Sequence, residues 1–414
     1  SANVGTVSIV EGLLSFGAPG GTINVGAIDV NGVADVDPLR ATLQLQAIIN
    51  TTGAINKTGA GVLQLNAQSL FTGDFNINAG GLRNGVGNAG SRFSRLTIAS
   101  GARYDLGGQT TTWGSLAGSG ELFSASGTPT LNVGFTNTDS IFSGRLMRFN
   151  DAAYAQLTKI GTGTLTMDSA QTADGSWSTI RVEGGRLVYS GAGKAFPATV
   201  ASAASVFSVD DGSVLELSNL TSAVNHRLGL NLAGTLEQRG GTLVLGGSAI
   251  SAVTERITIV AQQFGSGRIE LRPNAAQPLL MEVGTLNGGN AHSTLLFAGL
   301  TGVATGNGIA NLRLDTPNFL ANVAAQGAGL NGTTNRSIRG DILAAASADG
   351  KGDGFLVRDA LAVTVPTLAA NGATNFVMTV PSAAGIAIGA GVTGTGITGA
   401  WTCLLYTSLS PRDS

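Results

Sequence analysis

Cysteine, histidine and charge are all scarce in this sequence, and each shortage excludes a class of protein. The 414 residues include one cysteine and two histidines. A single cysteine cannot form an internal disulfide, and two histidines cannot build a His-rich metal site. Charged residues make up 12% of the chain, the net charge is −2, and no basic run is present. Electrostatics therefore gives no reason to expect binding to nucleic acid or to an anionic membrane.

Hydrophobic runs that would cross a membrane are missing as well. The charge-free stretch at residues 360–411 is interrupted by Gly and Thr in its 381–400 part, and Gly costs about 1 kcal/mol per helix position relative to Ala. The first residue is Ser1, and no positively charged segment is followed by an apolar one. We therefore predict no membrane span in this fragment. We also expect that any signal peptide is missing or already removed and that both natural ends are missing.

Glycine, by contrast, is abundant, with 62 residues, and hydrophobic residues still make up 43% of the chain. Disorder requires low hydrophobicity or high net charge, and collagen requires Gly at every third position, so neither fits. Apolar and polar residues alternate in short segments separated by Gly, which predicts strands with one buried face. These segments are residues 6–10, 21–25, 41–45, 61–65, 163–167, 212–217 and 241–245.

Two segments share a longer pattern, at residues 56–85 and 158–191. Each contains a lysine, then Gly-x-Gly-x-Leu, a polar turn with Gly, and a second strand region that contains Gly-Gly followed by a leucine. A partial third copy covers residues 234–245. A two-strand unit cannot bury its apolar face alone, but stacked units share one core. We therefore predict an all-β fold, a right-handed parallel β-helix or solenoid of stacked short strands. The alternative is a series of unrelated Gly-rich β-sandwiches.

The repeated pattern resembles the autotransporter-associated β-strand repeat of bacterial secreted passenger domains. Residues 71–73 (Phe-Thr-Gly) match the turn of that repeat, whereas residues 173–175 (Ala-Asp-Gly) depart from it. The resemblance implies a β-solenoid that is exported and folds outside the cell, on the extracellular side of the outer membrane. It also implies an outer-membrane β-barrel downstream in the same chain, with another sorting signal in that place as the open alternative.

Composition divides the chain into four predicted parts. Residues 1–250 carry the repeats, and residues 251–360 continue the solenoid or cap it with further β structure. Residues 361–401 begin another β-rich unit. Residues 402–414 differ in composition and contain the single cysteine. They resemble translated sequencing-adapter sequence at the end of a metagenomic reading frame, so we predict that this tail is an artefact.

Motifs that suggest ligand binding have simpler interpretations here. Gly-x-Gly-x-x-Gly occurs at residues 85–90, 327–332, 389–394 and 394–399. A dinucleotide site needs a strand before and a helix after this motif; after the first match, with Asp105 at the right distance, the sequence indicates strand and turn. Residues 349–354 (Asp-Gly-Lys-Gly-Asp-Gly) place Lys351 where a calcium-binding EF-hand loop needs an oxygen ligand. We predict a solvated turn there.

Catalytic chemistry finds little support in the sequence. His226 and His292 lie in polar contexts, where we expect surface histidines, and Cys403 belongs to the suspect tail. A polysaccharide-cleaving β-helix would need clustered carboxylates, and the candidate pairs are Asp210/Asp211 and Asp35/Asp37. Neighbouring residues in a strand point to opposite faces, which argues against the first pair. The larger aromatic residues are expected in the core or at the edge of the stack: Trp113, Trp177 and Tyr189.

The sequence thus predicts a structural or adhesive fragment of a large secreted surface protein, and not an enzyme. We predict no catalytic, cofactor-binding or metal-binding residues and no cofactor. The expected partners are glycans or proteins on host or environmental surfaces. Two alternatives remain open, a polysaccharide-cleaving enzyme on the same scaffold and a receptor-binding module like a phage tail fibre.

Overall fold

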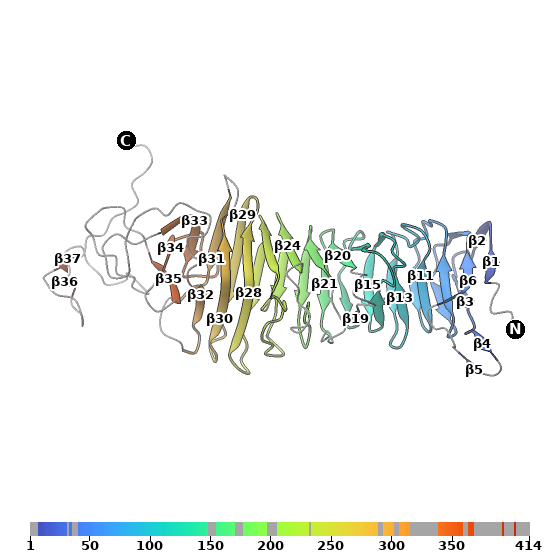
Figure 1. Cartoon of the computed structure of the whole chain (residues 1–414), viewed down its shortest axis with the longest axis horizontal. Helices are drawn as coiled ribbons and strands as arrows, with labels where there is room; N and C mark the ends of the chain where they lie inside the picture. Colours follow the sequence, from blue (N-terminus) through green and yellow to red (C-terminus); the bar gives the residue numbers. More distant parts are fainter. Residues whose placement is uncertain are drawn as a thin grey trace.

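The computed structural model shows a rod of short strands stacked side by side along one axis (Figure 1). The strands at the two described ends of the stack are β1 (Ser8–Val10) and β35 (Val363–Thr367). The described residues contain no helix, and therefore no helix that could cross a membrane. The structure describes residues 7–30, 33–34, 40–147, 155–169, 177–196, 205–231, 233–288, 293–301, 306–314, 338–358, 363–367, 391–392 and 401–402.

One parallel ladder runs through almost the whole rod, and we call it the continuous ladder. Each strand pairs in parallel with the equivalent strand of the next coil; Phe75, for example, pairs with Ile55 on one side and Leu96 on the other. In order, its strands are β3 (Gly21–Asn24), β8 (Ile55–Thr58), β10 (Phe75–Ile77), β12 (Arg95–Ile98), β15 (Ser115–Gly118), β18 (Ser140–Phe142), β21 (Thr164–Met167), β23 (Arg186–Tyr189), β25 (Val214–Leu217), β27 (Thr242–Gly246), β29 (Ser266–Arg272), β31 (Thr294–Ala298) and β33 (Ile338–Ala345).

The second side of the rod changes along its length. An N-terminal ladder accompanies the continuous ladder at first, and a C-terminal ladder replaces it. The N-terminal ladder contains β1, β6 (Ala41–Leu45), β9 (Val62–Leu65), β11 (Gly81–Asn84), β13 (Arg103–Asp105), β16 (Glu121–Phe123) and β19 (Arg145–Leu146). The C-terminal ladder contains β14 (Thr111–Trp113), β17 (Thr130–Val133), β20 (Gln156–Lys159), β22 (Thr179–Val182), β24 (Val206–Asp210), β26 (Thr235–Arg239), β28 (Val253–Gln262), β30 (Leu279–Asn287), β32 (Ala310–Leu314) and β35.

Three sides carry strands where these two ladders overlap, in the coils of β14–β16 and β17–β19. The first two coils also have a third strand each, β2 (Leu13–Ser15) and β7 (Ile48–Asn50), which pair in parallel. We call residues 41–146 the first section and residues 156–314 the second section. Coils are shorter in the first section: Gly81 pairs with Val62, 19 residues earlier. In the second section Ala310 pairs with Leu279, 31 residues earlier. Longer coils accompany longer strands, and β28 reaches 10 residues.

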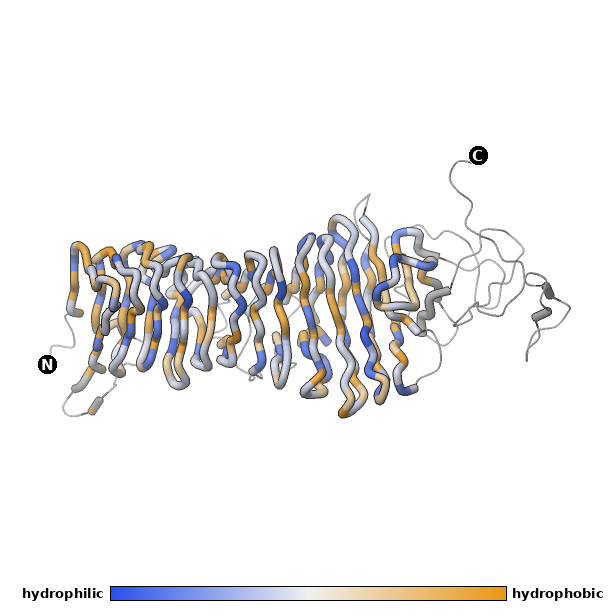
Figure 2. Tube along the Cα trace, turned by 180° about the vertical axis from the view of Figure 1, so that it is seen from behind, coloured by the Kyte–Doolittle hydropathy of each residue, from blue (hydrophilic) through white to orange (hydrophobic). Residues whose placement is uncertain are grey.

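Alternation of apolar and polar residues produces the core. In β21, Leu165 and Met167 are buried, whereas Thr164 and Thr166 lie on the outer surface side. The same alternation recurs in coil after coil, and Figure 2 shows hydrophobic and hydrophilic residues following one another along the trace. The parallel register places each buried leucine on the equivalent leucine of the next coil, as Leu187 on Leu165. One apolar core therefore extends along the rod, and the all-β solenoid prediction is confirmed. Its right-handedness stays a prediction.

Glycine occupies corners where neighbouring coils approach too closely for a side chain. Gly80 has a φ of 65°, and a Cβ atom there would lie 2.5 Å from the carbonyl oxygen of Gly61 in the preceding coil. Both the left-handed backbone and the close approach require glycine at this position. Gly80 belongs to the Gly-Gly of the first repeat copy, so the repeat pattern has a direct steric cause.

The two ends of the stack differ. At the C-terminal end, β33 pairs in parallel with β31, β34 (Gly354–Arg358) pairs antiparallel with β33, and β35 pairs antiparallel with both β34 and β32. This antiparallel cap joins the edges of the two ladders. At the N-terminal end, β1 pairs only with β6 among the described strands, and Ile9 and Leu13 are exposed. Beside the ladders lie small pairs of strands: β2 (Leu13–Ser15) with β7 (Ile48–Asn50), β4 (Asp29–Val30) with β5 (Val33–Ala34), and β36 (Gly391–Val392) with β37 (Trp401–Thr402).

The predicted division of the chain is not tested by these strands. Both long ladders continue on either side of residue 250, so the boundary there stays a prediction about sequence character. Of the predicted unit at 361–401, the structure describes residues 363–367, 391–392 and 401. The tail from Cys403 onward lies outside the described residues.

Candidate functional site

An exposed cluster of one arginine and two phenylalanines lies in the turns that lead into the continuous ladder. The rings of Phe93 and Phe135 meet edge to face, with centroids 5.5 Å apart. The guanidinium carbon of Arg92 lies 5.0 Å from each ring centroid. The two phenylalanines come from coils that are not adjacent. The coil between them has Trp113 in the position equivalent to Phe93, but this side chain is buried, and Gly114 follows it. We call these three residues the Arg92 cluster.

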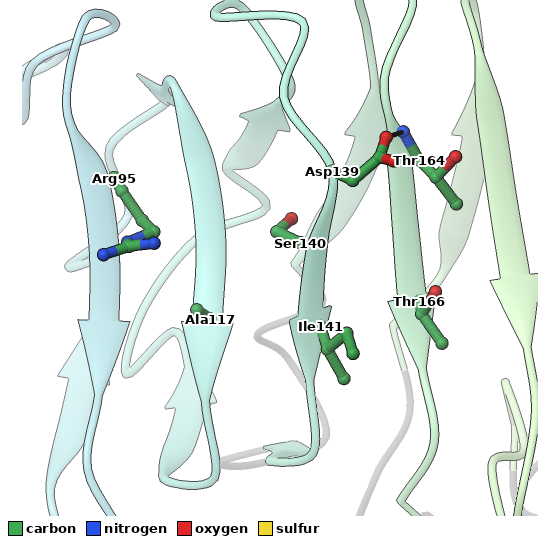
Figure 3. Close-up of a pocket in the computed structure, with 7 residues that line it drawn as sticks. All are labelled: Arg95, Ala117, Asp139, Ser140, Ile141, Thr164 and Thr166. Carbon is green, nitrogen blue, oxygen red and sulfur yellow. Dashed lines mark hydrogen bonds between the residues drawn. The ribbon is translucent and has the colours of Figure 1, made fainter.

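A shallow hollow of about 560 Å³ lies beside this cluster on the outer face of the continuous ladder. Its lining comes from four neighbouring strands and the turn before β18, as Figure 3 shows. The lining residues are Arg95, Ala117, Asp139, Ser140, Ile141, Thr164 and Thr166. Phe93 lies two residues before Arg95, and Phe135 lies four residues before Asp139. The cluster is thus close along the chain to two lining residues of the hollow, which itself crosses the strands along the rod.

Two features of the register produce this hollow. The outward row across the strands passes from Ala117 to Ile141 and then to Thr166, so a small side chain lies at its start. Asp139 borders the row, and one of its carboxylate oxygens accepts a hydrogen bond of 2.7 Å from the backbone N–H of Thr164. The other oxygen of Asp139 and the threonine hydroxyls provide polar groups for a ligand. Ile141 is 56% exposed.

Most other charged groups on the outer faces pair with each other. Glu121 lies between Arg103 and Arg145, at 3.1 and 3.3 Å. Glu270 lies between Arg268 and Arg272, at 2.5 and 2.6 Å. The parallel register brings Glu121 and its two arginines together from three successive coils, whereas Glu270 and its arginines alternate along the single strand β29. These rows of alternating charge occupy carboxylates that could otherwise act as acids or bases.

Arg92 differs from these arginines. No carboxylate in the described part of the chain pairs with its guanidinium group. Arg95, two residues later, pairs with Asp74 at 2.6 Å. Arg92 is therefore an exposed cation held against two aromatic rings, with its hydrogen-bond donors directed to no acidic partner.

Two buried lysines form part of the corners of the rod, and both belong to the repeat copies. The Nζ atom of Lys57 donates hydrogen bonds to the carbonyl oxygens of Gly59 and Ala79, at 2.6 and 2.8 Å. Lys159 donates to the carbonyls of Ile160, Gly161 and Gly184, at 2.7, 3.0 and 3.2 Å. Burial lowers the pKa of each lysine to about 8. Both ammonium groups tie a corner to the next coil, which is a structural role.

A second buried polar network lies in the second section. The side chain of Arg227 donates hydrogen bonds to Asn219 and to several backbone carbonyls, including that of Gly193 at 2.6 Å. The carboxylate of Glu255 accepts bonds from the backbone N–H groups of Arg227 and Leu228. Burial raises the pKa of Glu255 to about 7 and lowers that of Arg227 to about 10. This network closes a corner and opens onto no described hollow.

The residues considered for catalysis are separated or bound to other groups. Asp210 accepts a hydrogen bond of 2.5 Å from Arg181, whereas Asp211 is exposed, so this pair does not converge. His226 lies half-buried in a turn; its Nδ1 accepts a hydrogen bond from the backbone N–H of Arg256, and burial lowers its pKa. Asp35, Asp37, His292 and Cys403 lie outside the described residues. Within the described ranges, no three His, Cys, Asp or Glu side chains lie where they could hold a metal ion.

The glycine motifs and the large aromatic residues have structural positions. Trp113, Trp177 and Tyr189 are at most 1% exposed, as expected for the core. The motif at residues 85–90 is followed by β12, not by a helix. Its last member, Gly90, makes room for Trp113, because a Cβ atom there would lie 2.5 Å from the indole ring.

The Asp-Gly-rich loop at residues 349–354 forms the turn before β34 and is tied to the rod. Asp353 accepts a hydrogen bond of 3.1 Å from the backbone N–H of Ala346. Arg268 donates a bond of 2.8 Å to the carbonyl of Gly350. The loop thus serves as a turn of the antiparallel cap.

Sequence reasoning missed the Arg92 cluster and the structural role of the lysines. The lysines carried a signal, because a lysine begins the pattern in both repeat copies while lysine is otherwise rare. The cluster carried none, because Phe93 and Phe135 are 42 positions apart in the sequence. Only the lengths of the two intervening coils bring them together.

One curated protein shows distant similarity to this chain. It is named "Adhesin BmaC autotransporter", from Brucella suis biovar 1 (strain 1330), and is 29% identical over 299 residues. The match covers 62% of this chain and only 8% of the relative. No protein-family profile and no solved structure matches the chain.

Proposed function

We propose that this chain is a non-catalytic section of a secreted bacterial surface protein, a rod whose sides and loops serve adhesion or matrix formation. The uninterrupted continuous ladder carries this proposal, because it makes a long, stiff support with its outer face accessible. The distant similarity to a protein named as an autotransporter adhesin supports the same function.

The proposed absence of catalysis rests on how the acidic groups are used. Glu121, Glu216 and Glu270 pair with arginines of the same or neighbouring strands. General acid–base chemistry on a polysaccharide needs two carboxyl groups facing one bond. The hollow beside Arg92 has a single carboxylate, Asp139, among its lining residues.

The location and partners follow from the same proposal. The rod would be displayed on the extracellular side of the outer membrane and bind glycans or proteins of other surfaces. A translocating β-barrel farther along the full-length protein is part of this proposal. Residues 1–250 would supply most of the rod, and residues 251–360 its continuation and cap.

A bead-adhesion assay tests the adhesive function. The purified chain is coupled through Lys351, the exposed lysine of the cap loop, to fluorescent beads, which are then incubated with cultured mammalian cells and with polysaccharide-coated glass. We expect the folded chain to retain beads on at least one surface at several times the level of beads carrying the heat-denatured chain. Equal retention on every surface would overturn the proposal.

A matched assay separates adhesion from cleavage. The chain is incubated with a panel of acidic and neutral polysaccharides, and new reducing ends are measured over hours. We expect none above the level of the denatured chain. Turnover that survives further purification would instead favour the polysaccharide-cleaving alternative.

A further inference from the structure

The Arg92 cluster combines features that point to one class of ligand. Arg92 is an exposed cation without an acidic partner among the described residues, and its guanidinium group is held by two aromatic rings. A guanidinium group presents paired N–H donors that fit a carboxylate or a sulfate. Holding the arginine in place before binding reduces the entropy lost when a ligand arrives. These features favour a ligand with an anionic group.

The aromatic rings indicate a second feature of the ligand. Phe93 is 37% exposed and Phe135 is 40% exposed, so both rings retain surface that a ligand can cover. The C–H faces of sugar rings pack on aromatic surfaces, while their hydroxyl groups remain free to form hydrogen bonds. The edge-to-face arrangement of the two phenylalanines keeps this surface fixed.

The hollow supplies the polar groups that a sugar chain needs. Asp139 has a carboxylate oxygen that the Thr164 backbone does not use, and Thr164 and Thr166 place hydroxyl groups along the same side. The hollow crosses four neighbouring strands, and parallel strands repeat at about 4.8 Å. This interval is close to the length of one sugar unit, so an extended polysaccharide along the rod would meet equivalent positions in successive coils.

We propose that the Arg92 cluster and the adjoining hollow bind an acidic polysaccharide. A carboxylate or sulfate of the ligand accepts hydrogen bonds from Arg92, one sugar ring covers the exposed surface of Phe93 and Phe135, and the next units lie in the hollow toward Thr166. This proposal names a ligand class for the adhesive function proposed above and rests on it. An acidic peptide is disfavoured because the hollow is shallow and three of its lining side chains carry hydroxyl groups, which suit the many hydroxyl groups of a sugar chain.

Titration with defined oligosaccharides tests the site directly. The probe is a decamer of galacturonic acid, with a neutral glucose decamer and poly-glutamate of equal charge as comparisons, measured by isothermal titration calorimetry at low salt. We expect the uronic-acid decamer to bind and the neutral decamer not to bind. Binding should weaken strongly at 0.5 M salt because the central contact is ionic. Poly-glutamate that binds as tightly as the decamer would overturn the choice of polysaccharide.

Substitutions then locate the binding. Arg92→Gln should weaken binding of the decamer at least tenfold, and Phe135→Ala by several-fold. Arg103→Gln is the matched control, because Arg103 is also exposed but pairs with Glu121 on the N-terminal ladder. It should change binding less than twofold. Unchanged binding in the Arg92→Gln protein, with an unchanged circular dichroism spectrum, would show that this cluster is not the site.

The bead assay separates the two proposals. If the decamer binds at Arg92 but the wild-type beads adhere to nothing, the adhesive function fails and the polysaccharide site stands. If wild-type and Arg92→Gln beads adhere equally well while only the wild-type chain binds the decamer, adhesion uses another surface and the inference linking it to this site is wrong.

Discussion

The two repeat copies look alike in sequence but lie on different sides of the rod. In the first section, the first strand of the copy, β8, belongs to the continuous ladder and its second strand, β9, to the N-terminal ladder. In the second section, β20 belongs to the C-terminal ladder and β21 to the continuous ladder. The repeat therefore encodes a corner between two strands and does not specify which sides of the coil they occupy.

The buried lysines show what the two corners share and where they differ. Lys57 is the second-last residue of β8, and Lys159 is the last residue of β20. In both, the ammonium group donates hydrogen bonds to backbone carbonyls of the corner that follows. Lys57 serves two carbonyls, whereas Lys159 serves three. The two sections therefore share the same hydrogen-bonding arrangement at this corner, although the ladders on either side of the corner differ.

The largest expected effect comes from removing a core aromatic residue in one section. Trp113 is fully buried, packs against Phe71, Phe75 and Tyr104, and donates a hydrogen bond of 3.0 Å to the Tyr104 hydroxyl. Trp113→Ala should lower the free energy of unfolding by about 3–5 kcal/mol. Hydrogen exchange should increase mainly in the first section, because each coil contacts only its neighbours.

Phe207→Ala is the matched variant for the second section. Phe207 packs against Tyr189 and Phe196, with ring centroids 6.1 and 5.7 Å apart. In the Phe207→Ala protein, amide hydrogen exchange should increase around β22–β26. Amides near Trp113 should keep their protection. Uniform loss of protection over the whole rod in both variants would show that the sections unfold as one unit.

A smaller effect is expected from removing the lysine of either corner. Methionine keeps the apolar stem of the side chain and lacks the ammonium group. The carbonyls that accept hydrogen bonds from that group are left without a donor, at a cost of about 1–3 kcal/mol. Lys159→Met should cost more than Lys57→Met, because three carbonyls lose their partner instead of two. Urea unfolding at pH 7 measures both. The reverse order would show that the number of carbonyls does not determine the strength of the corner.

The pH dependence of stability should distinguish the lysine corners from the Glu255 network. Burial lowers the pKa of Lys57 and Lys159 from 10.5 to about 8. Between these values the unfolded chain binds more protons, so their contribution makes the free energy of unfolding rise with pH. Burial raises the pKa of Glu255 from 4.5 to about 7, so its contribution makes stability fall as pH rises through that window.

These three groups together place a stability minimum between about pH 7 and pH 8. Urea unfolding at pH 5, 7.5 and 10 measures the profile. The double variant Lys57→Met/Lys159→Met should lose only the rise of the free energy of unfolding between pH 7.5 and pH 10. Glu255→Gln should lose only the fall between pH 5 and pH 7.5. If the free energy of unfolding still rises between pH 7.5 and pH 10 in the double variant, groups other than these lysines cause the rise.

The smallest effect is expected on the charged outer face. Arg103→Gln breaks an exposed pair with Glu121, which should change the free energy of unfolding by less than about 1 kcal/mol. The change should shrink further at high salt. A larger loss, measured by the same urea unfolding, would mean that these rows of charge stabilise the stack more than isolated surface pairs do.

Sequence alone predicted the strands and the stacking because both depend on local pattern. Thr164–Met167 alternates outward and inward residues, and Gly80 occupies a corner that admits no side chain. The change of ladder at β14 could not be predicted, because three residues, Thr-Thr-Trp, add a side to the coil without altering the alternation around them.

The candidate site was hidden for a related reason. The Arg92 cluster requires that two successive coils have the lengths they do, so that Phe135 reaches Phe93 across Gly114. Coil length varies along the described rod from 18 residues, between Arg103 and Glu121, to 47, between Leu295 and Ile342. No fixed period in the sequence predicts which distant residues become neighbours.

The antiparallel cap has a consequence for how rods can associate. An unpaired strand edge is a template on which another chain can add a strand and begin a fibre. β33, β34 and β35 pair with one another and with β31 and β32, so the edges of both ladders are already paired there. Strand-by-strand growth is therefore blocked at this cap, and crowded rods would meet there through their sides.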